Sequence, residues 1–325
     1  RDQQFDSKGF FIGVSLVDED GTFANVETKN INVSAPAEVL TVDAGVDRTV
    51  NEGTFFTQTI NFTDPTDTDP AGRLYTVDWG DGTIENGRTV SAGSFNLGHA
   101  YADGANAYTV NVTVNDDGAQ SDSDSFLVTV ANVAPTLLLS GNGTAAEGSV
   151  YTLNISKSDP GADTITGYSV NWGDGSAAVA LTAAELATLS GNVQHTYADG
   201  TVARTITVQA TDEDGTWSQT KDITVNNVAP TIALSGNSTV NEGATYTLTL
   251  GAVTDPGDDT PTSYTINWGD GSAEVVTSLG DYTHVYADGP ADRSISVLVT
   301  DEDGAHTNAG TMTVTVNNVA PSVAL

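Results

Sequence analysis

The sequence predicts an all-β protein, an elongated tandem array of antiparallel β-sandwich modules. Apolar residues alternate with Thr, Ser or Asn in runs such as 264–268 (YTINW) and 294–300 (SISVLVT), which is the period of half-buried strands. Gly, Asp and Pro separate these runs, as the turns of a sandwich require. The same landmarks then return: NWGDGS stands at 171–176 and 267–272, and DWGDGT at 78–83. A spacing of roughly 95 residues indicates small domains rather than solenoid repeats of about 20 to 50 residues.

Each module carries its landmarks in one order. An EG pair comes first, a DP pair follows the second strand, the Trp of WGDG ends the third, H-x-Y-A-D-G follows the fifth, and DEDG or NDDG joins the last two strands before a closing AP. The predicted domains are the C-terminal part of a module at 1–37, whole modules at 38–134, 135–229 and 230–320, and the start of another at 321–325. These partial ends favour a segment of a longer repetitive chain. The alternative is strand exchange between copies in an open head-to-tail fibre.

One stretch departs from the strand pattern. Residues 181–191 (LTAAELATLSG) have helical spacing, and Thr182 with Glu185 matches a capping box. We therefore expect a short helix in the second module alone.

The charge and composition exclude several classes of protein. The 325 residues include 43 acidic and 10 basic side chains, a formal net charge of −33, which disfavours nucleic acid and anionic lipid as partners and favours cations. No apolar run approaches the ~18 residues of a membrane-spanning helix, so no membrane insertion is expected in this segment. The chain has no cysteine, which excludes disulfides and thiol chemistry.

The WGDG motif is predicted to be scaffold rather than an active site. A Trp that ends an alternating strand fills the core between the two sheets, and the Asp-Gly that follows makes a tight hairpin turn. The Tyr of H-x-Y shares a strand face with its His, and its hydroxyl can bond to the backbone as in a tyrosine corner. The predicted core and turn residues are Trp79, Asp81, Tyr101, Trp172, Asp174, Tyr197, Trp268, Asp270 and Tyr286.

With these motifs in place, the chain resembles the PKD domain, an immunoglobulin-like module. WGDG, then HTYADG at 195–200, then RTITVQATDEDG at 204–215 carry the resemblance. The linker NNVAPT and the following VNEG are similar to those of PKD-like repeats in giant bacterial surface proteins, secreted proteins and adhesins. The resemblance spans essentially the whole chain. It implies extracellular modules that act as spacers, adhesive units or contact surfaces for protein or carbohydrate, and it implies no catalysis.

The recurrent acidic turns predict a calcium site. In an immunoglobulin-like sandwich the DP and DEDG loops lie at the same end as the incoming linker, and the EG, GDG and ADG turns of the preceding module face that junction. In the third module, Asp255, Asp258, Asp259, Asp301 and Asp303 would then converge. Carboxylate and carbonyl oxygens suit Ca²⁺, which takes six to eight oxygens. The alternative is that Asp and Gly simply form turns and that surface acid maintains solubility.

The predicted ligands fall into two sets. The metal ligands are Asp18, Asp20, Asp64, Asp116, Asp117, Asp159, Asp163, Asp212, Asp214, Asp255, Asp258, Asp301 and Asp303. Candidate ligands across a junction between modules are Glu52, Glu147 and Glu242.

Two functions remain open, and no catalytic residue is predicted for either. The favoured one is a structural repeat array of an extracellular, bacterial surface protein, adhesin or filament. Its partners would be neighbouring modules, other copies in a head-to-tail fibre, extracellular polysaccharide or a surface protein. The alternative is a set of accessory carbohydrate- or protein-binding modules of a secreted hydrolase. Only Trp217 and Phe23, just after DEDG, lack a core role and could serve as exposed contacts. No carboxylate pair stands out for glycoside hydrolysis, and no nucleotide-binding or zinc-protease motif is present.

Overall fold

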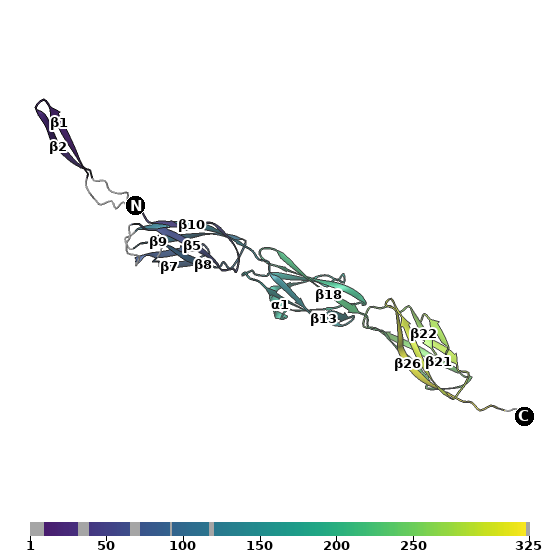
Figure 1. The fold of residues 1–325 in the computed structure, drawn as a ribbon. Helices are drawn as coiled ribbons and strands as arrows, with labels where there is room; N and C mark the ends of the chain where they lie inside the picture. The colour runs from purple at the N-terminus through teal and green to yellow at the C-terminus, as the bar shows by residue number, and fades with distance from the viewer. Residues whose placement is uncertain (1–9, 32–38, 66–71, 92, 117–119, 323–325) are drawn as a thin grey trace. The chain divides into compact units, whose positions relative to one another are not determined.

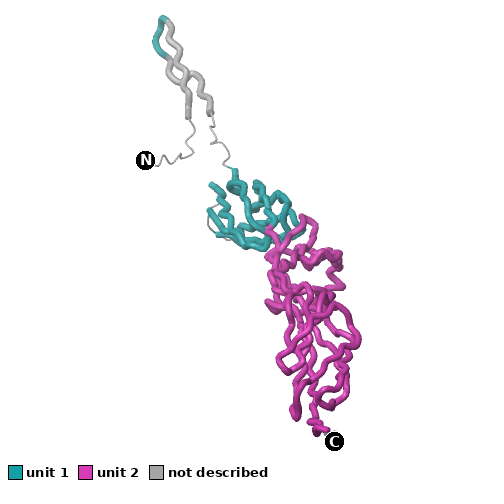
Figure 2. Tube along the Cα trace, turned by 90° about the vertical axis from the view of Figure 1, so that its right-hand side faces the viewer, with its two compact units in different colours: residues 1–132 teal, residues 133–325 magenta. Residues whose placement is uncertain are grey.

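The computed structural model describes residues 10–31, 39–65, 72–91, 93–116 and 120–322. The chain divides into two compact units, Arg1–Asn132 and Val133–Leu325 (Figure 2). The all-β, immunoglobulin-like fold class is confirmed, since the strands form a hairpin and three sandwiches (Figure 1). No helix within the described ranges has the length and apolar character needed to span a bilayer.

The first unit contains the hairpin and one sandwich. The hairpin pairs β1 (Phe10–Asp18) with β2 (Gly21–Ile31) in antiparallel register. The three-stranded sheet of the sandwich has the order β3 (Thr41–Asp43), β5 (Phe56–Thr63), β8 (Ser94–His99). Its five-stranded sheet has the order β4 (Arg48–Asn51), β10 (Ser121–Ala131), β9 (Asn106–Asn115), β6 (Leu74–Asp78), β7 (Ile84–Thr89).

The second unit contains two sandwiches of the same plan. In the second sandwich the sheets are β11 (Thr136–Ser140), β13 (Val150–Ser158), β16 (Asn192–Thr196), and β12 (Thr144–Ala146), β18 (Thr216–Asn226), β17 (Val202–Thr211), β14 (Gly167–Asn171), β15 (Val179–Thr182). In the third they are β19 (Thr231–Gly236), β21 (Thr245–Thr254), β24 (Gly280–Val285), and β20 (Thr239–Asn241), β26 (Ala305–Asn317), β25 (Ala291–Thr300), β22 (Ser263–Asn267), β23 (Ala273–Val276).

A strand crossing fixes the position of the EG turn in each sandwich. The short strands β4, β12 and β20 pair in parallel with the last strands β10, β18 and β26, whereas the strand just before each belongs to the opposite sheet. The EG pair follows the parallel strand, so it lies where the last strand ends and the outgoing linker begins. In the second sandwich Glu147 N donates to Asn226 O at 3.1 Å, and Gly148 N donates to Tyr197 O at 2.9 Å.

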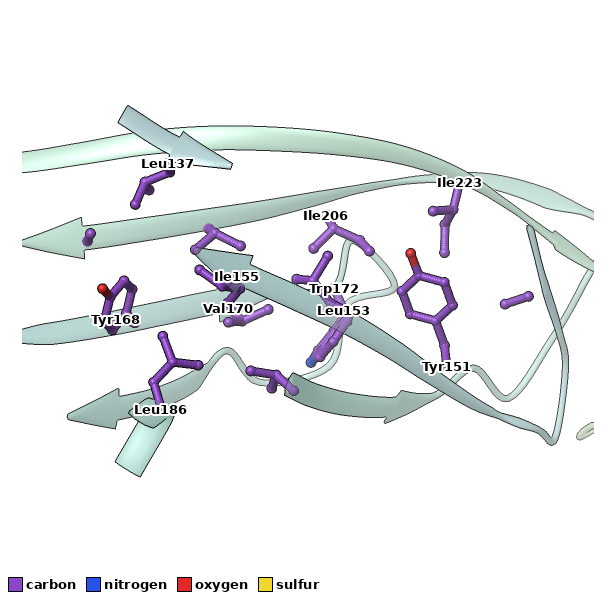
Figure 3. Close-up of a cluster of buried hydrophobic side chains, with 14 of the residues drawn as sticks. Leu137, Tyr151, Leu153, Ile155, Tyr168, Val170, Trp172, Leu186, Ile206 and Ile223 are labelled. Atoms are coloured by element: carbon purple, nitrogen blue, oxygen red, sulfur yellow. The ribbon is translucent and has the colours of Figure 1, made fainter. Parts of the chain in front are cut away.

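The core of each sandwich lies between its two sheets. In β17 the buried Ile206, Val208 and Ala210 alternate with more exposed residues, as the strand period requires. Trp172 and Tyr197 are each only 1% exposed, and Figure 3 shows Trp172 within this cluster. Burying an aromatic side chain of this size removes about 150 to 250 Å² from water, which stabilises the fold by up to roughly 4 to 6 kcal/mol. The equivalent Trp79 and Trp268 are 0% and 2% exposed.

A Tyr, a His and an Asp form the same set of contacts beside each of these tryptophans. The Tyr197 hydroxyl donates to Trp172 O at 3.2 Å, and the His195 ring stacks on the indole with centroids 4.8 Å apart. His195 Nε2 lies 2.6 Å from Asp174 Oδ2, and Ser176 N donates to Asp174 Oδ1 at 2.9 Å. Burial alone would raise the pKa of Asp174, but the hydrogen bonds from Ser176 and His195 outweigh it and lower that pKa to about 2. Equivalent contacts join Trp79, His99, Tyr101 and Asp81, and Trp268, His284, Tyr286 and Asp270.

The short helix expected in the second module is confirmed. Helix α1 (Ala183–Thr188) begins after Thr182, whose hydroxyl accepts from Glu185 N at 3.2 Å. The Glu185 carboxylate in turn accepts from Thr182 N at 2.8 Å, which completes the capping box. Leu186 is buried and joins the core of the second sandwich.

Candidate metal centre

Two loops of the third sandwich lie against two turns of the second, within the second unit. The loops are the DP loop after β21 and the DEDG loop after β25, and the turns are the EG turn after β12 and the ADG turn after β16. Asp258 N donates to Ala198 O at 2.9 Å. A Cβ on Gly257 would lie 2.8 Å from Glu147 Cδ, so the DP loop passes very close to the EG turn. The acidic residues of both sandwiches therefore come together here.

The first acidic group belongs entirely to the third sandwich. Oxygens of Asp255, Asp259 and Asp301 lie within 4.8 Å of one another. Asp255 Oδ2, Asp259 Oδ1 and Asp301 Oδ2 are all buried and accept no hydrogen bond within the described part of the chain. The Asp301 side chain is 0% exposed. Buried carboxylate oxygens without a donor are costly, so these three form the site in this unit that is best suited to a cation.

The second acidic group connects the two sandwiches. Glu147 and Asp199 of the second sandwich and Asp259 and Asp303 of the third place carboxylate oxygens within 4.8 Å of one another. Asp259 is common to both groups, so the two groups form one continuous site. Together they contain six carboxylates.

The linker residue Asn227 contacts this second group directly. Its Nδ2 donates to Asp303 Oδ2 at 2.8 Å and to Asp259 Oδ2 at 3.2 Å. The side-chain amide thus places its positive end between two carboxylates of the third sandwich. With its amide rotated, Asn227 would present an oxygen to a cation instead.

Glu147 also holds the linker that leaves its own sandwich. It is 0% exposed, and its carboxylate accepts from Gly200 N at 2.7 Å and from Val228 N at 2.6 Å. Glu242 repeats this arrangement in the third sandwich, accepting from Gly289 N at 2.6 Å and Val319 N at 2.8 Å. Glu147 and Glu242 therefore fix the start of the linker that follows their sandwich, a role that the sequence did not reveal.

The electrostatics of the six carboxylates are unfavourable without a cation. Burial first, and then the charges of Glu147 and Asp255, raise the pKa of Asp259 from its ordinary value of 3.8 to about 7. No Lys or Arg in the described ranges forms an ion pair with any of the six. Such repulsion is relieved when a divalent cation binds.

The remaining predicted ligands of the second unit lie in different environments. Asp258 is exposed and belongs to neither group, and its backbone N–H donates to Ala198 O in the ADG turn. Both oxygens of Asp212 accept hydrogen bonds, from Trp217 Nε1 and from its own loop. Asp159, Asp163 and Asp214 belong to neither of the two acidic groups.

The first unit shows a different arrangement at its DP loop. Asp64 Oδ2 pairs with Arg73 Nε at 3.0 Å. Asp116 Oδ1 accepts from Gln120 N at 2.6 Å, Asp20 is exposed and Glu52 is buried. Asp117, and the side chains of Asp18 and Phe23, lie outside the described residues.

The fold and the repeated Trp, Tyr and His contacts define a protein of tandem immunoglobulin-like sandwich modules. A family model described as PKD domain matches residues 39–130, 132–226 and 227–316. The chain belongs to the PKD domain family. It matches no curated protein sequence, and the comparisons identify no enzymatic family.

Several solved structures are similar in fold. A tetra-tandem repeat from the extending region of a large adhesion protein is 19% identical, covers 96% of this chain and 82% of its own, and has a TM-score of 0.38. The PKD domain of an M14-like peptidase from Thermoplasmatales archaeon SCGC AB-540-F20 is 23% identical, covers 29% of this chain and 93% of its own, and has a TM-score of 0.24. The fibronectin(III)-like modules of Clostridium thermocellum CbhA are 18% identical, cover 58% of this chain and 94% of their own, and have a TM-score of 0.25.

Proposed function

We propose that the chain is a non-catalytic structural repeat array of an extracellular surface protein, adhesin or filament, and that Ca²⁺ rigidifies its junctions. PKD modules are typically non-catalytic and typical of extracellular proteins. The observation that carries the calcium part is the set of three buried carboxylate oxygens on Asp255, Asp259 and Asp301 that accept no hydrogen bond from any described residue. They come from two loops that the strand order brings to one end of the third sandwich.

The chemistry of the donors suits a hard divalent cation. All are oxygens, and the chain has no cysteine, whereas softer metals favour sulfur and imidazole. Asp255, Asp259 and Asp301 would hold the ion, and carbonyl oxygens or water would complete the six to eight ligands of Ca²⁺. Glu147, Asp199, Asp303 and the amide oxygen of Asn227 would add ligands from the second group.

A cation here would stiffen the junction between the second and third sandwiches. Its ligands come from both sandwiches and from the linker, so bending at the linker would separate oxygens that share a charge. Asp259 belongs to both groups, which couples the ion within the third sandwich to the contact with the second. A bound cation would also neutralise the repulsion between the carboxylates of the second sandwich and those of the third, which otherwise pushes the facing ends of the two sandwiches apart.

The distribution of aromatic residues favours a spacer over a carbohydrate-binding module. Stacking on sugars needs aromatic faces open to solvent. The recurrent Trp and Tyr rings are buried in the cores, and the His rings stack on the Trp rings. Trp217 is hydrogen-bonded to its own loop. Phe55 is the one large aromatic side chain that is strongly exposed within the described residues.

Thermal unfolding of the full chain tests the proposal. The chain is heated in EGTA and in millimolar CaCl₂ at matched ionic strength. Ligand at ~100 times its Kd stabilises the folded state by about 2.7 kcal/mol, which raises the melting temperature of a module of this size by roughly 10 to 20 °C. Asp259→Asn should abolish this rise while leaving the protein in EGTA as stable as before or more so, because the substitution removes a repelled charge.

The outcome separates metal binding from turn chemistry. If calcium leaves the midpoint unchanged, or if Asp259→Asn destabilises the chain equally in both buffers, the carboxylates only form turns and the calcium proposal fails. Small-angle scattering in the two buffers reports the junction itself, since a stiffened array shows a narrower distribution of dimensions with calcium.

A further inference from the structure

The acidic side chains of the DP and DEDG loops have different partners in each of the three sandwiches. In the first sandwich, the DP aspartate Asp64 is paired with Arg73, whose side chain is 9% exposed while that of Asp64 is 1% exposed. A guanidinium of this chain therefore occupies the place beside the carboxylate. This loop contains its own cation.

In the second sandwich, a Trp satisfies the DEDG aspartate. Asp212 Oδ1 accepts from Asp214 N at 3.0 Å and Gly215 N at 2.8 Å, and Asp212 Oδ2 accepts from Trp217 Nε1 at 2.5 Å. The indole comes five residues after the aspartate. In the same sandwich Lys157, two residues before the DP aspartate, extends its Nζ to within 3.1 Å of Asp163 O.

In the third sandwich, both of these side chains are replaced. Val253 stands two residues before the DP aspartate, and His306 stands five residues after Asp301. Asp301 Oδ1 is near three donors, Asp303 N at 3.1 Å, Gly304 N at 3.1 Å and His306 Nε2 at 2.9 Å. Asp301 Oδ2 is buried and accepts none within the described part of the chain.

The two DEDG loops have the same acidic motif and therefore differ in which carboxylate oxygen the Trp217 or His306 side chain contacts. An indole N–H bonds to the second oxygen of Asp212, whereas the imidazole bonds to the oxygen of Asp301 that the loop already uses. The second oxygen of Asp301 is thus left without a donor among the described residues, and Asp301 lies in the group with Asp255 and Asp259.

We propose, resting on the calcium-binding function above, that the residue five positions after the DEDG aspartate selects which modules use that aspartate as a metal ligand. With His306 in this position Asp301 binds a hard divalent cation. With Trp217 in this position Asp212 does not. The first sandwich needs no metal at Asp64, because Arg73 neutralises it. The DEDG aspartate is thus used for an ion in the third sandwich and not in the second, although both sandwiches contain the motif.

Matched substitutions in the full chain test this selection. Calcium binding is measured by isothermal titration calorimetry for Asp301→Asn, Asp212→Asn and the unchanged chain. Asp301→Asn should weaken binding at one site by about 100-fold, since affinity follows the number of charged ligands. Asp212→Asn should leave calcium affinity unchanged and lower the melting temperature equally in EGTA and in calcium.

A second variant keeps the test valid if Asp301→Asn folds poorly. His306→Trp should supply an indole N–H to Asp301 Oδ2 and weaken calcium binding by about 10- to 100-fold, as changes beside a metal ligand do, while the fold in EGTA is retained. Trp217→His is the control and should leave binding at the Asp301 site unchanged.

The outcomes distinguish this selection from the function on which it rests. If the unchanged chain binds calcium but Asp212→Asn and Asp301→Asn weaken it alike, or His306→Trp has no effect, the selection is wrong and the calcium proposal stands. If the unchanged chain binds no calcium, both are overturned.

Discussion

Substitution of the buried glutamate that holds the linker offers the sharpest test of the junction. Glu147 accepts backbone hydrogen bonds from Gly200 at 2.7 Å and Val228 at 2.6 Å and is 0% exposed. In Glu147→Gln the amide keeps one acceptor oxygen, but its NH₂ group faces the other backbone N–H. One charge-assisted hydrogen bond is thereby replaced by two opposed donors.

The magnitude follows from the value of such bonds. A hydrogen bond to a charged group contributes about 1.5 to 3 kcal/mol, and a buried donor without a partner costs about 1 to 3 kcal/mol. These two figures describe the same lost bond and are not added, so we expect the substitution to destabilise the closed linker by about 2 to 3 kcal/mol. At 1.4 kcal/mol for each factor of ten, this corresponds to roughly 25- to 150-fold more frequent opening.

Hydrogen exchange of the backbone amides measures this opening directly. In EGTA, the Val228 and Gly200 amides of Glu147→Gln should exchange roughly 25- to 150-fold faster than in the unchanged chain. Glu242→Gln is the matched control, because Glu242 makes the same two bonds but belongs to none of the acidic groups found among the described residues.

Two results would refute the reasoning. Unchanged exchange at Val228 would show that Glu147 does not hold the linker. An equal loss of calcium response in Glu147→Gln and Glu242→Gln would show that Glu147 has no special part in the second acidic group.

Three further predictions concern the scaffold. Arg73→Met removes the guanidinium that pairs with the buried Asp64 carboxylate, so it should lower the free energy of unfolding of the first sandwich by about 3 to 5 kcal/mol in urea titrations. Adding Asp64→Asn should restore most of this loss, and a loss below about 1 kcal/mol would contradict the importance of the pair. Gly173→Ala would place a Cβ 2.5 Å from a backbone oxygen in a residue with φ +77°. The melting temperature of this variant should fall well below that of Gly175→Ala, in which the new Cβ meets no atom and only the positive φ costs about 1 kcal/mol. Equal melting temperatures would show that the turn relaxes around the new Cβ. The pKa of Asp174 is lowered to about 2 in the folded chain, so the stabilisation from this carboxylate is complete above the unfolded pKa near 4 and is lost as pH falls toward 2. Asp174→Asn should therefore flatten the pH dependence of the free energy of urea unfolding between these two values. An unchanged pH dependence would rule out this contribution of Asp174.

The fold could be predicted because its determinants are local and periodic. Alternation along β17 and β25 gives the buried face of each strand, and the Asp-Gly pairs give the turns. The Trp at the end of a strand has one place to go in a sandwich, and Thr182 with Glu185 determines a helix start by itself. Each of these signals depends on a few neighbouring residues, so a single sequence contains them.

The candidate site could be predicted only in part. Sequence register indicated that the DP and DEDG loops would meet, and Asp255, Asp259 and Asp301 do lie together. Register could not show which of two adjacent carboxylates points inward. The Asp258 side chain is exposed, and this loop is positioned by a bond from Asp258 N to Ala198 O, which lies 60 positions earlier in the chain.

The recurrence of an acidic motif is therefore weaker evidence for a metal than the state of each oxygen in it. Asp212 and Asp301 stand in the same DEDG sequence. Both oxygens of Asp212 accept hydrogen bonds, whereas Asp301 has a buried oxygen to which no described residue donates. An unsatisfied buried carboxylate oxygen must be compensated by a proton, a basic side chain or a metal ion. Arg73 provides the second solution at Asp64, and near Asp301 no Lys or Arg in the described residues does so. A repeat protein can thus keep one backbone plan in every module and place its ions by changing single side chains beside the loops.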